Sequence, residues 1–410
     1  MRSLLLAAVA ALLALPARAR KLASVSLPFE EIDLDLPPGK RWTAFAMRHR
    51  GDIVTRCQQQ GQLYQRALGK DIAARWVKAA TPSSELRAEY QGLVSAVNHS
   101  DVTFDCLVLT DMWQAVDAPS FGCTGLLAAM PDGRVIHGRN IDYDVSMMQK
   151  TAEAVGAAGT SGGALFDGVF IRGGRPLFTF LASTGSLGIH TGMRLGAYSI
   201  DSNARIINDT MLDNLAAHEA GGKNFPWVLR ELLQTAPDFR SAVQTMEAVE
   251  LNAPNYFILA GAGPYEGAVV TKDRFTTHNP LTPPTQWLSA ARGVWYLVQT
   301  NDDLLHPPID ARRGAARSRL SQSRQSQVNM GFVLRLMEAS PTTNSLTVAT
   351  WVADPRAGLH AAFARPTEEF ERGLLEREFH HALHVRMPED LPLSGKQQGQ
   401  GALRGSLQIR

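Results

Sequence analysis

Residues 123–142 read CTGLLAAMPDGRVIHGRNID, and this stretch has the pattern of a β-hairpin. The proline of the Pro-Asp-Gly segment at 131–133 presets a turn-forming φ, and the glycine supplies a positive one. Apolar runs flank the segment on both sides, as the two strands of a hairpin require. With Asp132 and Gly133 as a two-residue loop, Cys123 would lie directly opposite Asp142.

This predicted register places a carboxylate beside a thiol. Side chains that lie opposite each other share a face, with Cβ atoms about 5 Å apart. Asn140 would lie on that face too, whereas Arg139 would need a bulge or an early strand end to reach it. Taken alone, Cys123 is more simply a small buried apolar residue, and Arg139 with Asp142 a partly exposed ion pair. The hairpin by itself leaves both interpretations open.

The composition of the whole chain is that of a globular protein. Of 410 residues, 45% are hydrophobic and 20% charged, which excludes a wholly disordered chain. This length suits about two or three domains, or one large sheet-based domain. The net charge of +2 favours no nucleic-acid partner. Three cysteines are too few for a disulfide scaffold, and neither a paired CxxC nor a GxxxxGK[ST] phosphate loop occurs.

Residues 1–19 have the three parts of a secretory signal peptide. Arg2 provides the positive start, an apolar run follows to Leu15, and Ala-Arg-Ala at 17–19 is a small-x-small cleavage site. The run is shorter than the roughly 20 residues that span a bilayer. We therefore expect residues 1–19 to be removed and the mature chain to follow the secretory route.

Two further features agree with that route. The sequons at Asn98 and Asn208 are acceptor sites for N-glycosylation. An oxidising compartment would also allow a disulfide between Cys57 and Cys106. Cys123 would then remain as a reactive thiol or as one end of an intermolecular bridge.

The secondary-structure signals change character at Cys123. Amphipathic helices are predicted over 52–68 and 84–97, after an extended segment at 31–36. From Cys123 onward, short β-rich runs separated by glycine turns alternate with helical stretches. This mix predicts an α+β protein in which helices pack on sheets in layers. The Gly-, Gln- and Ser-rich tail at 393–410 is predicted to fray.

Four blocks carry a family resemblance. They are LDLPPGKRW at 34–42, the hairpin sequence continued to Tyr143, NYFILAG at 255–261 with VTKDR at 270–274, and WYLVQTND at 295–302 with HP at 306–307 and DARR at 310–313. In content and order they closely resemble the acid ceramidase and N-acylethanolamine acid amidase family, which is related to the choloylglycine hydrolases. The resemblance covers about residues 30–355.

The resemblance implies an N-terminal nucleophile hydrolase with a four-layer αββα sandwich. In that class the precursor cleaves itself before the nucleophile, here between Gly122 and Cys123. The Cys123 thiolate would attack the Gly122 carbonyl, and water would open the resulting thioester. The products would be a mostly helical α chain of residues 20–122 and a catalytic β chain of residues 123–410, which stay associated.

The resemblance also implies roles for individual residues. The freed α-amino group of Cys123, with a reference pKa of about 7.7–8.0, would act as the base, and Asp142 would orient it. Arg139 would favour the thiolate over the thiol. Asn301 would donate its amide N–H to the oxyanion, and Arg312 would position substrate or support Asn301.

One position departs from the family pattern. Where the family usually has an Asn-Glu-Arg-like run, this chain has Asn203-Ala204-Arg205, so the glutamate is absent. We expect Asn203 and Arg205 at the edge of the site. The absence of the glutamate bears on substrate preference or on the acid limb of the pH profile. Asn140 and Asn203 are the polar candidates for contact with substrate.

The implied substrate is a fatty-acyl amide, such as ceramide or an N-acylethanolamine, which would be hydrolysed to a fatty acid and an amine through a thioester. We expect no cofactor, no metal and no nucleic acid, but transient contact with a membrane surface. The compartment would be lysosomal, extracellular or, in a bacterium, periplasmic. Apolar residues after the hairpin would line an acyl channel, unless they are ordinary core. They are Met147, Met148, Leu165, Phe166, Val169 and Phe170.

Other interpretations have less support. Residues 159–163 match GxSxG but lack the preceding strand and following helix of a serine nucleophile. Glu376, His380 and His384 recur on one helix face, where a solvated charged surface explains them more simply than a metal site. The alternative from another class is a catalytically impaired, secreted lipid-binding protein on the same fold. The missing glutamate favours it, whereas the presence of Cys123, Arg139, Asp142 and Asn301 argues against it.

Overall fold

The computed structural model describes residues 27–67, 69–116, 121–143, 165–207, 210–275 and 285–364. Within these ranges, no helix is long and apolar enough to cross a membrane. Several predicted features lie outside the described residues. They are the signal peptide, Met147, Met148, the GxSxG segment at 159–163, Asn208, Glu376, His380, His384 and the 393–410 tail.

Before Cys123 the chain is mostly helical, as predicted. One strand, β1 (Phe29–Asp33), comes first. The helices that follow are α3 (Thr43–Arg48), α4 (Arg50–Ala67), α5 (Lys70–Ala79), α6 (Ser84–Val97) and α7 (Phe104–Val116). The two amphipathic helices predicted from the sequence correspond to α4 and α6. Ser83 begins α6 because its side-chain oxygen accepts a hydrogen bond from the Leu86 N–H.

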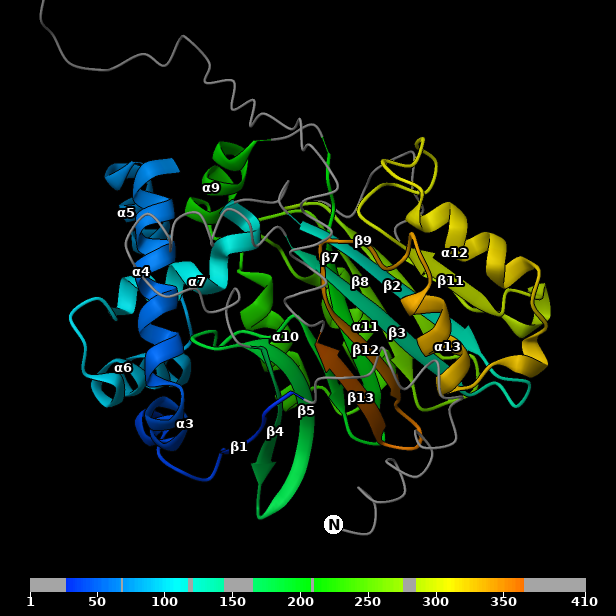
Figure 1. Ribbon diagram of the computed structural model, residues 1–410, viewed down its shortest axis with the longest axis horizontal. Helices are drawn as coiled ribbons and strands as arrows, with labels where there is room; N and C mark the ends of the chain where they lie inside the picture. The colour runs from blue at the N-terminus through cyan, green and yellow to red at the C-terminus, as the bar shows by residue number, and fades with distance from the viewer. Residues whose placement is uncertain are drawn as a thin grey trace, which may run out of the picture.

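From Phe121 onward, the described chain forms most of two sheets (Figure 1). Within the described residues, the larger sheet has eight strands in the order β1-β4-β5-β6-β7-β8-β9-β10. The added strands are β4 (Leu165–Arg172), β5 (Arg175–Ser183), β6 (Thr191–Arg194), β7 (Tyr198–Ala204), β8 (Asn255–Gly261), β9 (Gly267–Lys272) and β10 (Thr285–Trp287). Here β1 pairs parallel with β4, and the remaining neighbours are antiparallel.

The smaller sheet carries the hairpin and is antiparallel. Its described strands follow the order β11-β2-β3-β12-β13. They are β2 (Phe121–Ala129), β3 (Val135–Tyr143), β11 (Tyr296–Gln299), β12 (Thr347–Asp354) and β13 (Leu359–Ala364). The hairpin strands β2 and β3 therefore lie inside the sheet, flanked on both sides.

The two sheets stack face to face, and helices cover both outer faces (Figure 1). The larger sheet packs against the N-terminal helices and against α9 (Met211–Glu219), α10 (Phe225–Thr235) and α11 (Phe239–Ala248). The smaller sheet packs against α12 (Arg312–Ser321) and α13 (Met330–Glu338). Between the sheets, Leu127 of β2 belongs to the same apolar cluster as Tyr256 and Ile258 of β8. The structure thus confirms an α+β fold with αββα layers.

The hairpin forms where predicted, but its loop has three residues and not two. Met130 closes the loop by donating its N–H to the carbonyl of Arg134 at 2.7 Å. Gly133 occupies the left-handed position of the turn, with a φ of +85°, which glycine adopts without strain. A three-residue loop with a left-handed glycine at its end is a common hairpin connection. The predicted two-residue loop was therefore wrong by one position.

This difference of one residue decides which side chains share a face. Cys123 pairs with Ile141, and Gly122 pairs with Asp142, so the predicted opposition of Cys123 and Asp142 was wrong. Because strand side chains alternate, a shift of one position exchanges the two faces of a strand. Arg139 consequently lies on the same face as Cys123, and no bulge in the hairpin is needed to bring it there.

Two of the residues predicted to line an acyl channel lie in the core instead. Phe166 packs on Phe45 of α3 with ring centres 4.8 Å apart, and Phe170 stacks on Phe178 of β5 at 4.7 Å. Both face the helix-covered side of the larger sheet. Alternation along β4 is the reason, because residues 166 and 170 are four apart and so point the same way. The prediction of a channel along them was wrong.

A disulfide joins Cys57 of α4 to Cys106 of α7, with Cα atoms 5.7 Å apart. Replacing both cysteines with serine should lower the free energy of unfolding by about 4 kcal/mol, because the bridge closes a loop with a sequence separation of 49. Urea titration of the variant in a Cys123→Ala background, which keeps Cys57 and Cys106 the only cysteines to vary, against that background alone, measures the change. A change below about 1 kcal/mol would contradict the expected entropic constraint.

Candidate active site

Cys123 is the third residue of β2 and lies between the two sheets, with only 3% of its surface exposed. Its Sγ atom lies 3.4 Å from Nη2 of Arg139 on β3. Its backbone N–H donates to Oδ1 of Asn301 at 2.8 Å, and its carbonyl accepts from Nη1 of Arg312 at 3.0 Å. Three of the predicted site residues therefore contact one cysteine directly.

Arg139 faces the thiol because acceptors of the larger sheet hold its guanidinium group. Nη2 donates to the carbonyl of Ser202 at 2.7 Å, and Nη1 donates to the Thr191 hydroxyl at 2.5 Å and to the His190 carbonyl. Burial raises the pKa of the Cys123 thiol, and the charge of Arg139 opposes that rise. Arg139 therefore favours the thiolate without making it the resting form.

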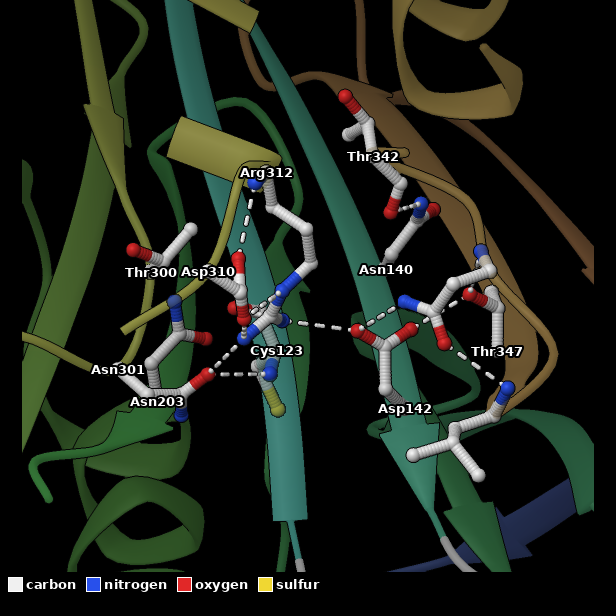
Figure 2. A network of polar contacts seen from close by, with 12 residues as sticks. Cys123, Asn140, Asp142, Asn203, Thr300, Asn301, Asp310, Arg312, Thr342 and Thr347 are labelled. Atoms are coloured by element: carbon white, nitrogen blue, oxygen red, sulfur yellow. Dashed lines mark hydrogen bonds and ion pairs between the residues drawn. The ribbon is translucent and has the colours of Figure 1, made fainter. Parts of the chain in front are cut away.

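Asn301 lies two residues after the end of β11, the strand that pairs with β2. Its Oδ1 atom accepts from both the Cys123 N–H and Nη2 of Arg312, the latter at 2.9 Å (Figure 2). Its Nδ2 atom donates to the carbonyl of Ala204 at 2.9 Å. These contacts hold the amide in one orientation beside the backbone of the cysteine.

Arg312 is the first residue of α12 and links the two hairpin strands to Asn301. Besides the Cys123 carbonyl, Nη1 reaches Oδ2 of Asp142 at 2.8 Å. Its Nε and its backbone N–H each donate to the carboxylate of Asp310 at 2.8 Å (Figure 2). Asp310 was not predicted as a site residue, although it belongs to the DARR block at 310–313. Its proximity to Arg312 in sequence was the available signal.

Asp142 lies on the helix-facing side of β3, away from the thiol. The Thr347 hydroxyl donates to its Oδ1 at 2.6 Å, and Asn344 donates to its Oδ2 at 3.2 Å. Burial raises the pKa of this carboxyl group, and the charge of Arg312 opposes the rise. Asp142 thus contacts the cysteine through Arg312. The sequence did not predict Thr347 or Asn344, because about 200 residues of chain separate them from Asp142.

Gly122 sits where any side chain would meet this ion pair. A Cβ atom there would lie 3.0 Å from Nη1 of Arg312 and 3.2 Å from Oδ2 of Asp142. Gly122→Ala should therefore displace the pair and slow any cleavage before Cys123 by about tenfold or more. The cleaved fraction over time, read on a denaturing gel, measures this.

Gly314→Ala is the matched control for that variant, because a Cβ atom at Gly314 would meet nothing within 4 Å. It lies in α12 beside Arg312, where alanine favours the helix. It should be cleaved at the wild-type rate. Equal rates in Gly122→Ala and in the wild type would contradict the steric argument.

Asn140 does not lie beside the thiol, so its prediction as a substrate contact is corrected. It pairs with Thr124 and is buried on the helix-facing side of β3. Its Nδ2 donates to the Met337 carbonyl at 2.7 Å and to the Thr342 carbonyl at 3.0 Å. The register shift is the reason, since it moves residues 140 and 142 to the same outer face.

The end of β7 borders the site at Asn301. Asn203 donates from Nδ2 to the carbonyl of Gln299 at 2.9 Å, and Figure 2 shows it next to Asn301. Arg205 instead forms a buried bidentate pair with Asp303, with contacts of 2.7 and 2.8 Å. Asn203 therefore stays a candidate for the edge of the site, while Arg205 holds the chain just after Asn301.

The fold and the cysteine together define a class of protein. The αββα sandwich is the fold that the resemblance implied for an N-terminal nucleophile hydrolase, and Cys123 lies near the start of a central strand, flanked by Arg139 and Asn301. This is the fold class predicted from the sequence.

Comparison with known proteins finds related sequences. The chain is 27% identical over 334 residues to the N-acylethanolamine-hydrolyzing acid amidase of Rattus norvegicus, covering 79% of this chain and 85% of that protein. It is 25% identical over 357 residues to the acid ceramidase of Homo sapiens, covering 83% and 86%. These relatives are amide hydrolases, and the predicted resemblance is confirmed. No protein-family model matches the chain.

A similar solved structure is the Caenorhabditis elegans N-acylethanolamine-hydrolyzing acid amidase ortholog. Its TM-score is 0.49 at 26% sequence identity, and the match covers 57% of this chain and 93% of that one.

Proposed function

We propose that this protein is a self-processing cysteine amidase that hydrolyses the amide bond of fatty-acyl amide lipids. One observation carries the proposal. The only thiol outside the disulfide, that of Cys123, lies 3.4 Å from the Arg139 guanidinium, and the N–H of the same residue is held by Asn301. Nucleophile and prospective base thus belong to one positioned residue. Relatives named amidase and ceramidase support the reaction class.

Self-cleavage would begin with attack of the Cys123 sulfur on the Gly122 carbonyl carbon. The peptide C–N bond breaks, the nitrogen takes up a proton as the α-amine, and a thioester joins the sulfur to Gly122. Water then hydrolyses the thioester and restores the thiol. Asn301 Oδ1, which accepts the peptide N–H at 2.8 Å, supports this step because it can keep the new amine in place.

Substrate turnover would repeat the chemistry on a fatty-acyl amide. The α-amine of Cys123 takes the thiol proton, the sulfur attacks the acyl carbonyl, and the C–N bond breaks as the amine product leaves with that proton. Water then hydrolyses the acyl thioester, which releases the fatty acid and restores the thiol. One N–H of Asn301 Nδ2 is committed to the Ala204 carbonyl, and we assign the other to the oxyanion. Asp142 anchors Arg312, which in turn orients Asn301, so its role becomes indirect.

The proposed α chain, residues 20–122, and β chain, residues 123–410, would stay associated. The edge strand β1 pairs with β4 along five residues, which ties the first segment to the larger sheet. Asp111 of α7 adds a buried contact, because its Oδ2 accepts the Gly188 N–H at 2.7 Å. Both contacts join a residue before Cys123 to a residue after it, so cleavage between Gly122 and Cys123 would leave them intact.

The substrate class is ceramide or an N-acylethanolamine, since the relatives carry both names. We place the protein on the secretory route, in a lysosome, outside the cell or in a periplasm. The signal-peptide pattern at residues 1–19 and the Cys57–Cys106 disulfide support this location. Transient contact with a membrane surface would deliver the lipid.

The test is the intact mass and N-terminal sequence of the purified protein, followed by an assay with a fluorogenic fatty-acyl amide. We expect a fragment that begins Cys-Thr-Gly-Leu-Leu, and release of the fluorophore after incubation at mildly acidic pH. An uncleaved chain that binds the lipid without hydrolysing it would overturn the proposal. That result would favour the alternative of a catalytically impaired lipid-binding protein.

A further inference from the structure

A buried polar pair lies between the sheets and has no part in the proposed mechanism. His137 of β3 and Asp201 of β7 are both fully buried, with Nε2 of the histidine 3.1 Å from Oδ2 of the aspartate. The other ring nitrogen of His137 lies 2.9 Å from the Ser199 hydroxyl. Among the described residues, Oδ1 of Asp201 has no hydrogen-bond partner. A buried carboxylate with an unpartnered oxygen is costly and calls for an explanation beyond packing.

The pair lies on the same face as the thiol. His137 precedes Arg139 by two residues on β3, so their side chains point the same way. Gly125 pairs with Arg139 and follows Cys123 by two residues on β2. A Cβ atom at Gly125 would come within 3.2 Å of Oδ2 of Asp201. The carboxylate is therefore next to the two strands that carry the thiol and the guanidinium.

The charge of Asp201 acts against that of Arg139. Charges interact strongly in a buried site because little water screens them. Burial is the main cause that raises the pKa of the Cys123 thiol, Arg139 lowers it, and the carboxylates of Asp142 and Asp201 raise it. Asp142 is already ion-paired with Arg312 on the other face of β3. Of these two carboxylates, Asp201 is the one on the face that Arg139 and the thiol share.

The other titratable groups around Asp201 do not replace it. His137 and Arg139 face it from β3, and Cys123 lies nearby on β2. On the β6 side, burial and the charge of Arg139 lower the pKa of His190 to about 3, so this ring is neutral at ordinary pH. The one carboxylate of the β7 segment is Asp201.

We propose that Asp201, oriented by His137, is a positioning residue that partly neutralises Arg139 and so limits ionisation of the Cys123 thiol. The thiol then keeps its proton until the α-amine of the same residue removes it. This inference rests on the proposed function, in which Cys123 is the nucleophile.

The test is the pH titration of the thiol in the full-length protein carrying Asp201→Asn. Cys123 is the single free thiol, since the other two of the three cysteines form the disulfide. Ultraviolet absorbance of the thiolate, with the Cys123→Ala protein as background, follows its ionisation without substrate. Loss of the negative charge should lower the titration midpoint by about one pH unit.

Two controls separate charge from structure. Asp201→Glu keeps the charge and should retain the wild-type midpoint. Asp167→Asn removes another histidine-paired carboxylate of the larger sheet, 2.8 Å from Nε2 of His360, and should also leave the midpoint unchanged. A folded Asp201→Asn protein with the wild-type midpoint would overturn the inference.

If Asp201→Asn does not fold, the double variant His137→Gln/Asp201→Asn is used. It removes the charge of Asp201 and replaces the His137–Asp201 pair with two amide side chains. The same downward shift is expected. Failure of both variants to fold would mean that the pair is structural, and the inference would be wrong. If the wild-type protein had no amidase activity while Asp201→Asn still shifted the midpoint, the proposed function would be wrong and the electrostatic inference would stand.

Discussion

Replacing Cys123 with alanine should leave a single uncleaved chain and reduce amidase activity by at least about 10⁴-fold. The variant lacks the sulfur for both proposed steps, so neither the thioester with Gly122 nor the acyl-enzyme can form. The missing sulfur is buried and small, and the strand retains its contacts to Asn301 and Arg312 through backbone atoms. Intact mass, a denaturing gel and fluorophore release from a fatty-acyl amide measure the result.

Cys123→Ser is the informative partner of this variant. Its hydroxyl group can occupy the same position, yet it ionises far less readily than a thiol, so we expect slow cleavage and weak residual activity. Both variants should unfold at urea concentrations near that of an uncleaved wild-type precursor. Full activity in folded Cys123→Ala protein would show that the reaction uses another nucleophile.

Replacing Asn301 with alanine should lower kcat by about 10²- to 10³-fold, because the oxyanion would lose its side-chain donor. Cleavage before Cys123 should slow as well, since the variant also removes the Oδ1 acceptor that holds the Cys123 N–H and Arg312. Single-turnover assays on protein that has completed cleavage separate this loss from incomplete processing.

Asn214→Ala is the matched control for the loss of a buried asparagine. Asn214 of α9 is buried, donates to the Ala115 carbonyl at 2.8 Å and accepts from Arg274 at 2.9 Å, without contact to Cys123. We expect a comparable loss of stability but wild-type kcat per folded molecule. If the two variants lost activity equally, the effect of Asn301 would be one of folding and not of catalysis.

Local sequence patterns predicted the elements that carry the site. The Pro-Asp-Gly turn and its apolar flanks predicted the hairpin of β2 and β3, and amphipathic spacing predicted α4 and α6. These signals are local because they arise from the φ preferences of turn residues and from side-chain alternation. Residue identities at Cys123, Arg139, Asn301 and Arg312 came from the ordered family blocks, and the structure brings these four together.

Two predictions about the site were wrong for the same physical reason. The loop of the hairpin holds one residue more than predicted, with Gly133 as its left-handed member, and this reversed the predicted faces of Arg139 and Asp142. Along β4, Phe166 and Phe170 face the helices and not the thiol. In both cases apolar and polar patterning identified the strand, but the side that each residue faces depended on pairing and packing beyond it.

The sequence by itself determined the strand, the nucleophile candidate and the class of fold, because these depend on neighbours along the chain and on recognisable blocks. Only the tertiary structure decided that Arg139 faces the thiol, that Asp142 contacts Arg312 on the opposite face of β3, and that Asp201 lies near Arg139 between the sheets. The Cys123–Asn301 and Asp142–Arg312 contacts join residues 178 and 170 positions apart. Such contacts are set when sheets and helices pack, and local conformational preference carries no information about them.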